Sequence, residues 1–325
     1  MLYPLKFHPV YKSILWGGRN IEKKFNRNIP DGKIAESWEL CCRNDGMSIV
    51  SNGDLKDLTF EAMLEKYKEQ LVGTDVYGAY KNFLPLFIKI IDANDRLSVQ
   101  VHPDDKYAKS HGEGNGKTEM WYIIDAKPGA KLVYGLKTGV TKSDFIHSLS
   151  GGNLGELLNE IPVSPGDVFY IPSGTIHAIL DGILIAEIQQ NSNTTYRVFD
   201  WNRVDKNGKP RELHIDKAIE VINFDNPPVL NRNRNYVDKG GYNERVLSEN
   251  DYFTVKELNI SDEFTGETDG RKFTVYMFIE GNGHIYYEKG CEPVSLGETV
   301  MLPASMGKYS IKGHAKILEI YVNTK

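Results

Sequence analysis

Runs of apolar residues, each closed by glycine or proline, recur along most of the chain. They are rich in β-branched and aromatic residues: LFIKIIDA, RLSVQVH, EMWYIID, DVFYIPSG, ILIAEIQQ, FTVYMFIEGNGHIYYE and AKILEIYVN. Short runs of this kind, bounded by turn residues, are typical of strands. The pattern therefore predicts a mainly β protein. Gly281-Asn282-Gly283 predicts a hairpin within one of these runs.

Three other segments have a helical period. Thr59 is a candidate N-cap ahead of apolar residues that share one helix face, beginning at Phe60. Thr141 and Asp144 have the spacing of a capping box. Residues 211–223 show a weaker amphipathic period. We expect these few helices to pack as accessories against the β core.

A polar stretch at residues 224–241 separates two parts of the chain. Its sequence, FDNPPVLNRNRNYVDKGG, holds a Pro-Pro pair and several asparagines and has no apolar period. Such composition indicates a linker. We therefore expect an N-terminal domain at 1–223 and a C-terminal domain at 241–325.

An internal repeat links these two parts. Residues 164–172, SPGDVFYIP, align with residues 295–303, SLGETVMLP, at a constant offset of 131. Glycine, acid, apolar strand and proline match in register, which indicates two copies of one β unit. The same offset places Lys308 where the first copy has His177, so we expect any metal site to be confined to the first copy.

Composition excludes several classes of function. The 325 residues carry 39 basic and 44 acidic side chains, a net charge of −5, which is not the footprint of a nucleic-acid binder. No apolar run approaches 18 residues, and the N-terminus lacks a secretory pattern, so no membrane partner is expected. Three cysteines form neither a disulfide framework nor Cys-x-x-Cys spacing, which favours a cytoplasmic location. The sequence leaves monomer and homodimer open.

Four residues form a candidate metal site. Gln100 and His102 are two apart in a strand-like run and so face the same side, and Glu119 begins the next strand. Residues 166–177 fit Gly-x5-Pro-x-Gly-x2-His, the second cupin motif, and end at His177. Gln100-x-His102 and Glu119 stand where the first motif has His-x-His and Glu. A small barrel projects such residues to one point.

The donor set suits one Zn²⁺ with an open position, although Fe²⁺ or Mn²⁺ would also bind it. Other readings of the residues remain open at this stage. His177 could be a core histidine, and Gln100 could bind a ligand or water rather than metal. Glu119 could cap a turn or pair with Lys117.

Four blocks of sequence resemble the type I mannose-6-phosphate isomerases in their short bacterial form. They read FIKIIDANDRLSVQVHPDD, GKTEMWYII, PGDVFYIPSGTIHAI and AEIQQNSNTTYRVFDWNR, with WGG at 16–18 and IAESWEL at 34–40 in agreement. The resemblance implies a tandem cupin: a catalytic barrel within 1–223, with helical insertions, and a metal-free cupin-like barrel at 241–325. It also implies one zinc per chain and a sugar phosphate substrate, interconverted between mannose 6-phosphate and fructose 6-phosphate.

The resemblance also implies roles for individual residues. These are zinc ligation by His102, Glu119, His177 and Gln100, and catalysis by Arg197, Glu187 and Lys117. The chain departs from longer members of the family in the short stretch between His102 and Glu119. It departs again where NSNTTYRVFD replaces their arginine-containing sequence. The residues that bind the sugar are therefore left open.

Aldose–ketose isomerisation needs a proton carrier and stabilisation of an enediolate. Arg197 could stabilise that charge or the phosphate, or instead form a structural ion pair with Asp200. Glu187 is our first choice of proton carrier, against an ion pair on an outer strand face. Lys117 could be an acid or a phosphate anchor, or a solvated surface residue. Proton transfer and hydride shift are both compatible with the sequence.

Three further functions compete with this interpretation. One is isomerisation of another sugar phosphate, such as glucose 6-phosphate. A redox cupin is disfavoured because Gln100 replaces a second histidine. A non-catalytic sugar-phosphate-binding module is disfavoured because binding alone needs no open metal position.

Overall fold

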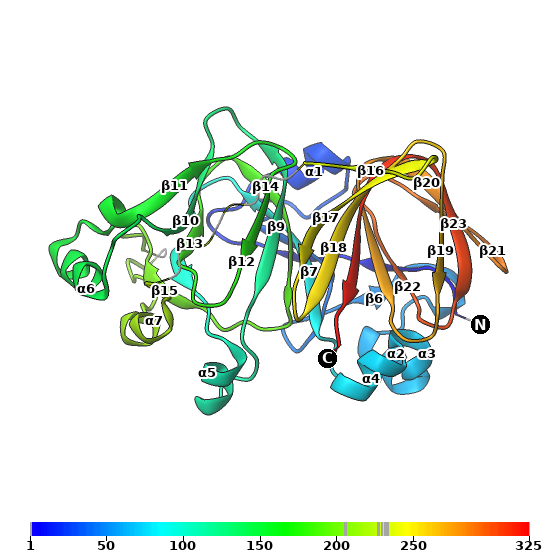
Figure 1. Ribbon diagram of the computed structural model, residues 1–325, viewed down its shortest axis with the longest axis horizontal. Coiled ribbons are helices and arrows are strands. Elements are labelled where there is room, and N and C mark those ends of the chain that lie inside the picture. Colours follow the sequence, from blue (N-terminus) through cyan, green and yellow to red (C-terminus); the bar gives the residue numbers. More distant parts are fainter. Residues whose placement is uncertain (1, 205–206, 226–227, 229, 231–233, 325) are drawn as a thin grey trace.

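The strands of the protein form two barrels that lie side by side (Figure 1). The computed structural model describes residues 2–204, 207–225, 228, 230 and 234–324. The predicted linker at 224–241 falls partly outside these residues. The fold is mainly β with accessory helices, as the apolar runs predict.

Two sheets build the first barrel. The longer has the order β12 (Val168–Ile171), β9 (Glu119–Ala126), β14 (Ile183–Gln190), β7 (Leu86–Ala93), β3 (Glu36–Leu40) and β2 (Val10–Lys12). The shorter has the order β11 (Leu158–Pro162), β10 (Lys131–Leu136), β13 (His177–Ile179), β8 (Val99–Val101) and β15 (Tyr196–Phe199). Their facing side chains form an apolar interior that includes Trp121, Tyr134 and Phe169. The candidate residues lie at one end of this interior.

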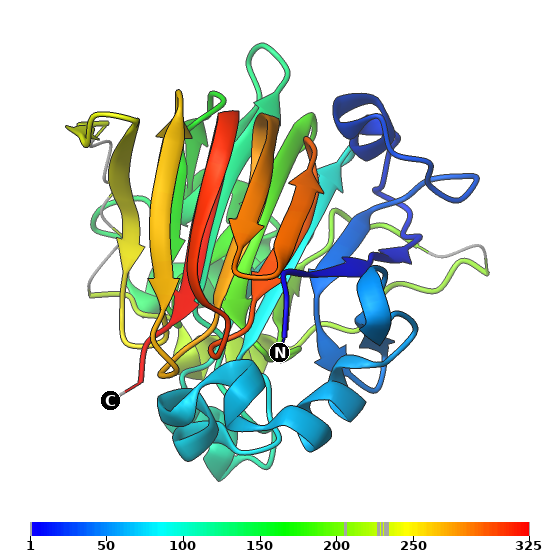
Figure 2. The same cartoon turned by 90° about the vertical axis from the view of Figure 1, so that its right-hand side faces the viewer.

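The second barrel takes strands from both ends of the chain. Its sheet has the order β16 (Val237–Asp238), β17 (Tyr242–Glu249), β18 (Phe253–Ile260), β23 (Gly307–Val322), β20 (Thr274–Tyr287), β22 (Thr299–Leu302), β1 (Leu5–His8) and β6 (Ile49–Val50). β19 (Glu263–Thr268) pairs with β23, and β21 (Gly290–Val294) pairs with β20. Figure 2 shows the N-terminal strand lying against these C-terminal strands. The extreme N-terminus therefore belongs structurally to the second sheet.

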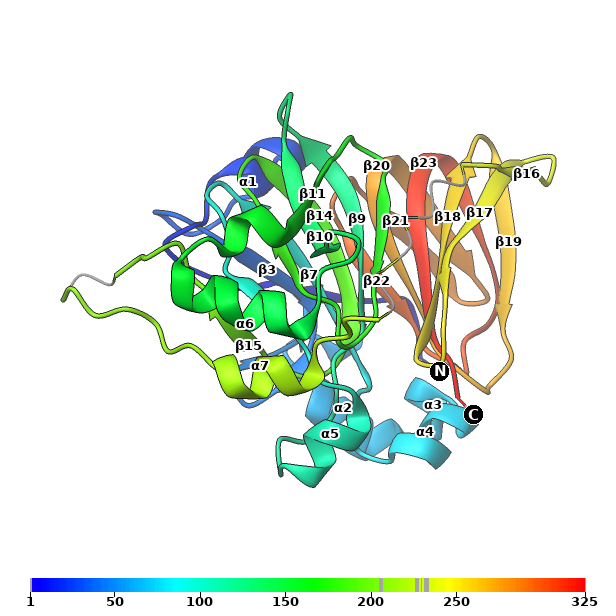
Figure 3. The same ribbon diagram turned by 60° about the vertical axis from the view of Figure 1, so that its left-hand side comes forward.

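Helices cover the barrels from outside. They are α1 (Asn20–Phe25), α2 (Phe60–Tyr67), α3 (Glu69–Val72), α4 (Thr74–Tyr80), α5 (Asp105–Ser110), α6 (Lys142–Gly151) and α7 (Ile215–Val221), with 3-10 turns at Gly53–Leu55 and Leu154–Leu157 and a two-strand hairpin of β4 (Cys42–Arg43) and β5 (Gly46–Met47). Figure 3 shows α6 and α7 over the outer face of the shorter sheet, where Phe145 and Ala218 are buried. None of the described helices has the length and hydropathy that spanning a bilayer requires.

The predicted helix starts are confirmed. The Thr59 side chain accepts a hydrogen bond from the Ala62 N–H at 3.1 Å, and Thr141 and Asp144 form a complete capping box. The first helix ends earlier than its apolar period suggests. Lys68 has a φ of +45°, which breaks the helical path before Leu71.

The two barrels pack face to face through a continuous apolar layer. The layer joins side chains from β7, β9 and β14 to side chains from β18, β20 and β23. Two arginines add polar links across it. Arg27 pairs with the buried Glu39 and donates to the Gly297 carbonyl, and Arg245 pairs with the buried Glu257 and donates to the Gly166 carbonyl at 3.1 Å. This contact holds the second barrel rigidly against the first.

The internal repeat is confirmed as a structural repeat, but its extension beyond the proline needs a correction. β12 and β22 begin and end at the same offset of 131. After Pro303, however, the inward-facing residue that matches His177 is Tyr309 rather than Lys308. His177 pairs across the sheet with Gln100 and Tyr134, and Tyr309 pairs with Gly266 and Tyr287. One extra residue in the second turn shifts the alternation, which leaves Lys308 exposed.

The hairpin expected at Gly281-Asn282-Gly283 is wrong. β20 continues through these residues and pairs with β23 along its length, with a register shift between Phe278 and Glu280. A Cβ on Gly281 would lie 1.9 Å from the His314 carbonyl oxygen, so glycine is needed for close approach of the two strands. The glycines of this segment therefore allow close approach of two strands and do not form a turn.

Candidate metal centre and active site

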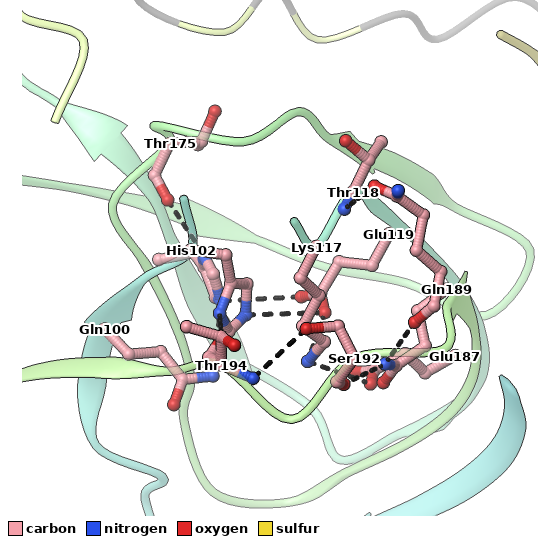
Figure 4. Close-up of polar contacts among 12 residues, drawn as sticks. Gln100, His102, Lys117, Thr118, Glu119, Thr175, Glu187, Gln189, Ser192 and Thr194 are labelled. Carbon is pink, nitrogen blue, oxygen red and sulfur yellow. Dashed lines mark hydrogen bonds and ion pairs between the residues drawn. The ribbon is translucent and has the colours of Figure 1, made fainter. Parts of the chain in front are cut away.

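The structure brings the four candidate ligands together, and Figure 4 shows Gln100, His102 and Glu119 among the polar contacts of the site. Gln100 lies on β8, and His102 follows that strand directly. Glu119 begins β9, and His177 begins β13. The nearest donor atoms of the two histidines and Glu119 lie within 4.8 Å of one another, and all three side chains are fully buried.

Both histidines are held in the tautomer that a metal ligand requires. His102 Nδ1 donates to the Thr194 carbonyl at 2.9 Å, and His177 Nδ1 donates to the Thr175 carbonyl at 2.9 Å. Because a carbonyl oxygen only accepts, each Nδ1 carries the proton and each Nε2 keeps a lone pair. Burial, reinforced by Lys117, lowers the pKa of His102 to about 3, and burial lowers the pKa of His177. Both rings are therefore neutral at physiological pH.

Glu119 places its two oxygens between these rings. Oε2 lies 3.5 Å from His102 Nε2, and Oε1 lies 3.4 Å from His177 Nε2. Burial alone would raise the pKa of Glu119, but the ammonium of Lys117, 2.7 Å from Oε2, holds it well below its usual value. Neither oxygen accepts a hydrogen bond with good geometry from the described residues.

Gln100 completes the set from the neighbouring strand. Its Nε2 donates to His177 Nε2 at 3.3 Å. Rotation of the amide by 180° would present Oε1, an acceptor, at the same point. The side chain therefore reaches the cluster and can supply the amide oxygen that the donor set needs.

The residues present fit a bound divalent cation. His102 Nε2 and both oxygens of Glu119 are buried without a hydrogen-bond partner among the described residues, although Lys117 forms an ion pair with Glu119. Unpaired buried acceptors of this kind are costly unless a cation or donor satisfies them. Imidazole hydrogen bonds to backbone carbonyls are also the usual support of metal-binding histidines. Nitrogen and oxygen donors in this number suit zinc and its first-row neighbours.

A row of alternating charges runs from the cluster into the barrel mouth. Lys117 Nζ lies 3.6 Å from Glu187 Oε1, and Lys89 Nζ lies 2.9 Å from the same oxygen. Trp121 Nε1 donates to Glu187 Oε2 at 2.9 Å, and Glu36 lies 3.7 Å from Lys89. Burial opposes the charge on Lys89, but Glu187 and Glu36 hold its pKa above the usual value. Glu187 is thus fixed and flanked by two cations.

Sequence reasoning missed Lys89 and Glu36. Lys89 is the one charged residue inside the otherwise apolar run LFIKII. This run is part of β7, whose eight residues are all buried. A charge at such a position needs a buried partner, which was the available signal. Glu187 is that partner, because β14 and β7 are neighbours and the two residues pair directly.

Arg197 lies on β15, directly opposite Gln100 on β8. Its Nη1 donates to the Glu212 carbonyl at 2.7 Å, and its Nε is buried without a partner among the described residues. Asp200 instead pairs with Arg203 and Arg211. Burial, with the nearby charge of Arg211, lowers the pKa of Arg197, but a guanidinium stays charged at neutral pH.

A cavity of about 430 Å³ opens beside the charged row. Its lining includes Lys12, Glu36, Lys89, Lys117 and Asn193. A volume of this size accommodates a small polar ligand. Lys117, which lines this cavity, also lies 2.7 Å from Glu119 and so connects the cavity to the metal donors.

Comparisons with known proteins agree with this geometry. The sequence model of the phosphomannose isomerase type I catalytic domain matches residues 4–131, and that of the mannose-6-phosphate isomerase cupin domain matches residues 243–322. Mannose-6-phosphate isomerase ManA of Bacillus subtilis is 38% identical over 97% of this chain and 98% of its own. The Streptococcus mutans mannose-6-phosphate isomerase is 35% identical over 99% of each.

A crystal structure of the mannose 6-phosphate isomerase from Bacillus subtilis superposes with a TM-score of 0.89. It is 35% identical and covers 98% of this chain and 99% of that one. Both the fold and the full-length sequence similarity lead to one assignment. The chain belongs to the type I mannose-6-phosphate isomerase family.

Proposed function

We propose that the chain interconverts mannose 6-phosphate and fructose 6-phosphate by proton transfer at this site. The observation that carries the proposal is a buried cluster of metal donors placed directly beside a carboxylate held between two lysines. Relatives named mannose-6-phosphate isomerase, which are 35–38% identical over nearly the whole chain, support the proposal.

His102, Glu119 and His177, together with Gln100, would hold one divalent cation, which we propose to be zinc. When bound, such an ion supplies a Lewis acid for the oxygens of the sugar. The Thr194 and Thr175 carbonyls orient the two imidazoles, and burial keeps both rings neutral.

Glu187 is the proposed proton carrier. Isomerisation removes a proton from the carbon next to the carbonyl and returns it to the neighbouring carbon. Trp121 fixes one oxygen of Glu187, which leaves the buried Oε1 between the two lysines, both of which line the cavity. Lys117 would hydrogen-bond a sugar oxygen, and Lys89 would hold the carboxylate of Glu187 in position through their ion pair. Arg197 would stabilise the negative charge of the enediolate or of the phosphate.

Metal removal tests the role of the cluster. Dialysis against a chelator is expected to abolish turnover of mannose 6-phosphate, and stoichiometric zinc is expected to restore it. A coupled assay for fructose 6-phosphate measures turnover, and separate reactions with mannose 6-phosphate and with glucose 6-phosphate distinguish the two substrates. Full turnover in protein shown to be metal-free would contradict the proposal.

Substitution of Arg197 tests its part. The change Arg197→Ala is expected to lower turnover by about 10²-fold or more, as is typical when a charge-stabilising group is lost. Zinc content is expected to stay near one per chain, because the arginine touches none of the metal donors. Arg203→Ala, which removes a neighbouring arginine paired with Asp200, is the matched control. Near-normal turnover of the Arg197 variant would remove it from the catalytic set.

The arrangement of domains and the location in the cell belong to the same proposal. We propose a catalytic domain at 1–223 and a C-terminal domain at 241–325. Strands β1 and β6 of the first segment pair into the sheet of the second. A cytoplasmic location is supported by Cys41, Cys42 and Cys291, which are all free thiols.

A further inference from the structure

The second barrel repeats the charged row of the first. In the first barrel Glu187 pairs across the sheet with Lys89 and Trp121. In the second barrel Glu319 pairs in the same way with Lys256 and Tyr276. Extension of the two registers matches further positions: Glu36 with Glu244, Lys117 with Lys272, and Gln189 with Tyr321.

The contacts within the two rows also correspond. Tyr276 donates its hydroxyl to Glu319 Oε1 at 2.8 Å, as Trp121 donates to Glu187. Lys256 Nζ lies 3.7 Å from Glu319 and 4.0 Å from Glu244, as Lys89 lies beside Glu187 and Glu36. Chance seldom rebuilds the same row of charges at matching positions of two sheets, and the second row is partly buried. The second row is therefore a copy of the first.

The metal donors have no such counterpart. The residues at the four positions are Gly266, Thr268, Thr274 and Tyr309, in place of Gln100, His102, Glu119 and His177. None of the four is an imidazole, a carboxylate or an amide side chain. The second barrel has thus lost the donors for a metal and kept the polar row.

The loss of the glutamate leaves Lys272 without a direct ion pair among the described residues, although the charges of Asp269 and Glu319 still act on it. Lys117 lies 2.7 Å from Glu119, but the residue that corresponds to Glu119 is Thr274. Lys272 forms no ion pair with any described residue, and its ammonium lies 3.6 Å from the centre of the Tyr321 ring. Lys256, with 27% of its side chain exposed against 10% for Lys89, is also more open to solvent.

We propose that Lys256 and Lys272 form a second, metal-free binding site for a phosphorylated sugar in the C-terminal barrel. The ammonium groups would bind the phosphate, and Glu244 and the Tyr321 ring would contact the sugar. This inference takes its ligand class from the proposed function of the first barrel and therefore rests on it. Without metal donors the site binds its ligand and does not isomerise it.

Calorimetric titration of the full-length zinc enzyme tests the proposal. The probe is 1,5-anhydromannitol 6-phosphate, which has no carbonyl form and cannot be isomerised. The wild type is expected to bind two molecules per chain. Lys272→Met is expected to weaken one of the two events by roughly tenfold or more, and Lys272→Arg to retain it. Lys312→Met, at an exposed lysine on β23 paired with Glu263, is the matched control and should keep both events.

The outcomes separate this inference from the proposed function. Binding of one molecule per chain by the wild type, or of two by a folded Lys272→Met variant, would overturn the second site. Lys117→Met should abolish the other event together with turnover. Full turnover of Lys117→Met would count against the proposed catalytic row, whatever the number of probe molecules bound. Thermal unfolding of each variant establishes that it is folded.

Discussion

Replacement of Glu119 by glutamine is expected to abolish metal binding and turnover together. Glu119 is the one anionic donor of the cluster, and its two oxygens lie between the lone pairs of His102 and His177. The glutamine amide has the same shape as the carboxylate but carries no charge. Its NH₂ group would face either a histidine Nε2 or the metal. Loss of the Lewis acid costs several kcal/mol of transition-state stabilisation, which corresponds to a rate loss of about 10³-fold.

Two measurements decide this prediction. Elemental analysis of the purified variant should show zinc well below one per chain, and the coupled assay should show turnover near background. Glu160→Gln, at an exposed carboxylate that pairs with Lys131, is the matched control and should keep both. A variant with one zinc and wild-type turnover would show that Glu119 is not a ligand.

Substitution of Glu187 is expected to separate catalysis from metal binding. Glu187→Gln should lower kcat by about 10²–10⁴-fold, the usual contribution of a general base, while zinc stays near one per chain. Proton transfer in D₂O should also carry deuterium from the solvent into the product, and the variant should slow that exchange in parallel. Wild-type kcat, or product formed by the wild type without any solvent deuterium, would argue against Glu187 as the carrier.

Loss of turnover in Glu187→Gln must be distinguished from loss of protein stability. Glu187 and Lys89 are almost fully buried, and removal of one partner of such a pair typically destabilises a protein by about 3–5 kcal/mol. Glu187→Asp keeps the charge and shortens the side chain by one methylene. It should therefore unfold closer to the wild-type temperature and still lose turnover. The recurrence of the pair as Lys256 and Glu319 makes this comparison necessary, because the pair also stabilises a barrel that has no metal donors.

Local patterns predicted those parts of the molecule that depend on neighbours in sequence. The strands follow from apolar runs, and the starts of α2 and α6 follow from Thr59 and the Thr141–Asp144 capping box. Alternation along β8 correctly placed Gln100 and His102 on one side of the strand. These features need no knowledge of strand order.

Features that depend on strand order could not be predicted. The contact between Glu187 and Lys89 exists because β14 lies beside β7, and the sequence does not encode that neighbour in any local signal. The match of Tyr309 to His177 depends on one extra residue in a turn, which a constant sequence offset hides. The sequence does not identify the residues that bind the phosphate or the ion that the cluster holds. Both depend on groups that meet only in the folded barrel.

The pairing of β1 with β22 has a consequence for folding during synthesis on the ribosome. Met301 is synthesised about 296 residues after its partner Leu5. At roughly 5–20 residues per second, that delay is about 15–60 s. β6 can pair with one edge of β1 early, but the other edge stays unpaired until β22 has been synthesised. An open strand edge is a template for aggregation. We therefore expect this edge of β1 to be the part of the nascent sheet most exposed to pairing with other chains.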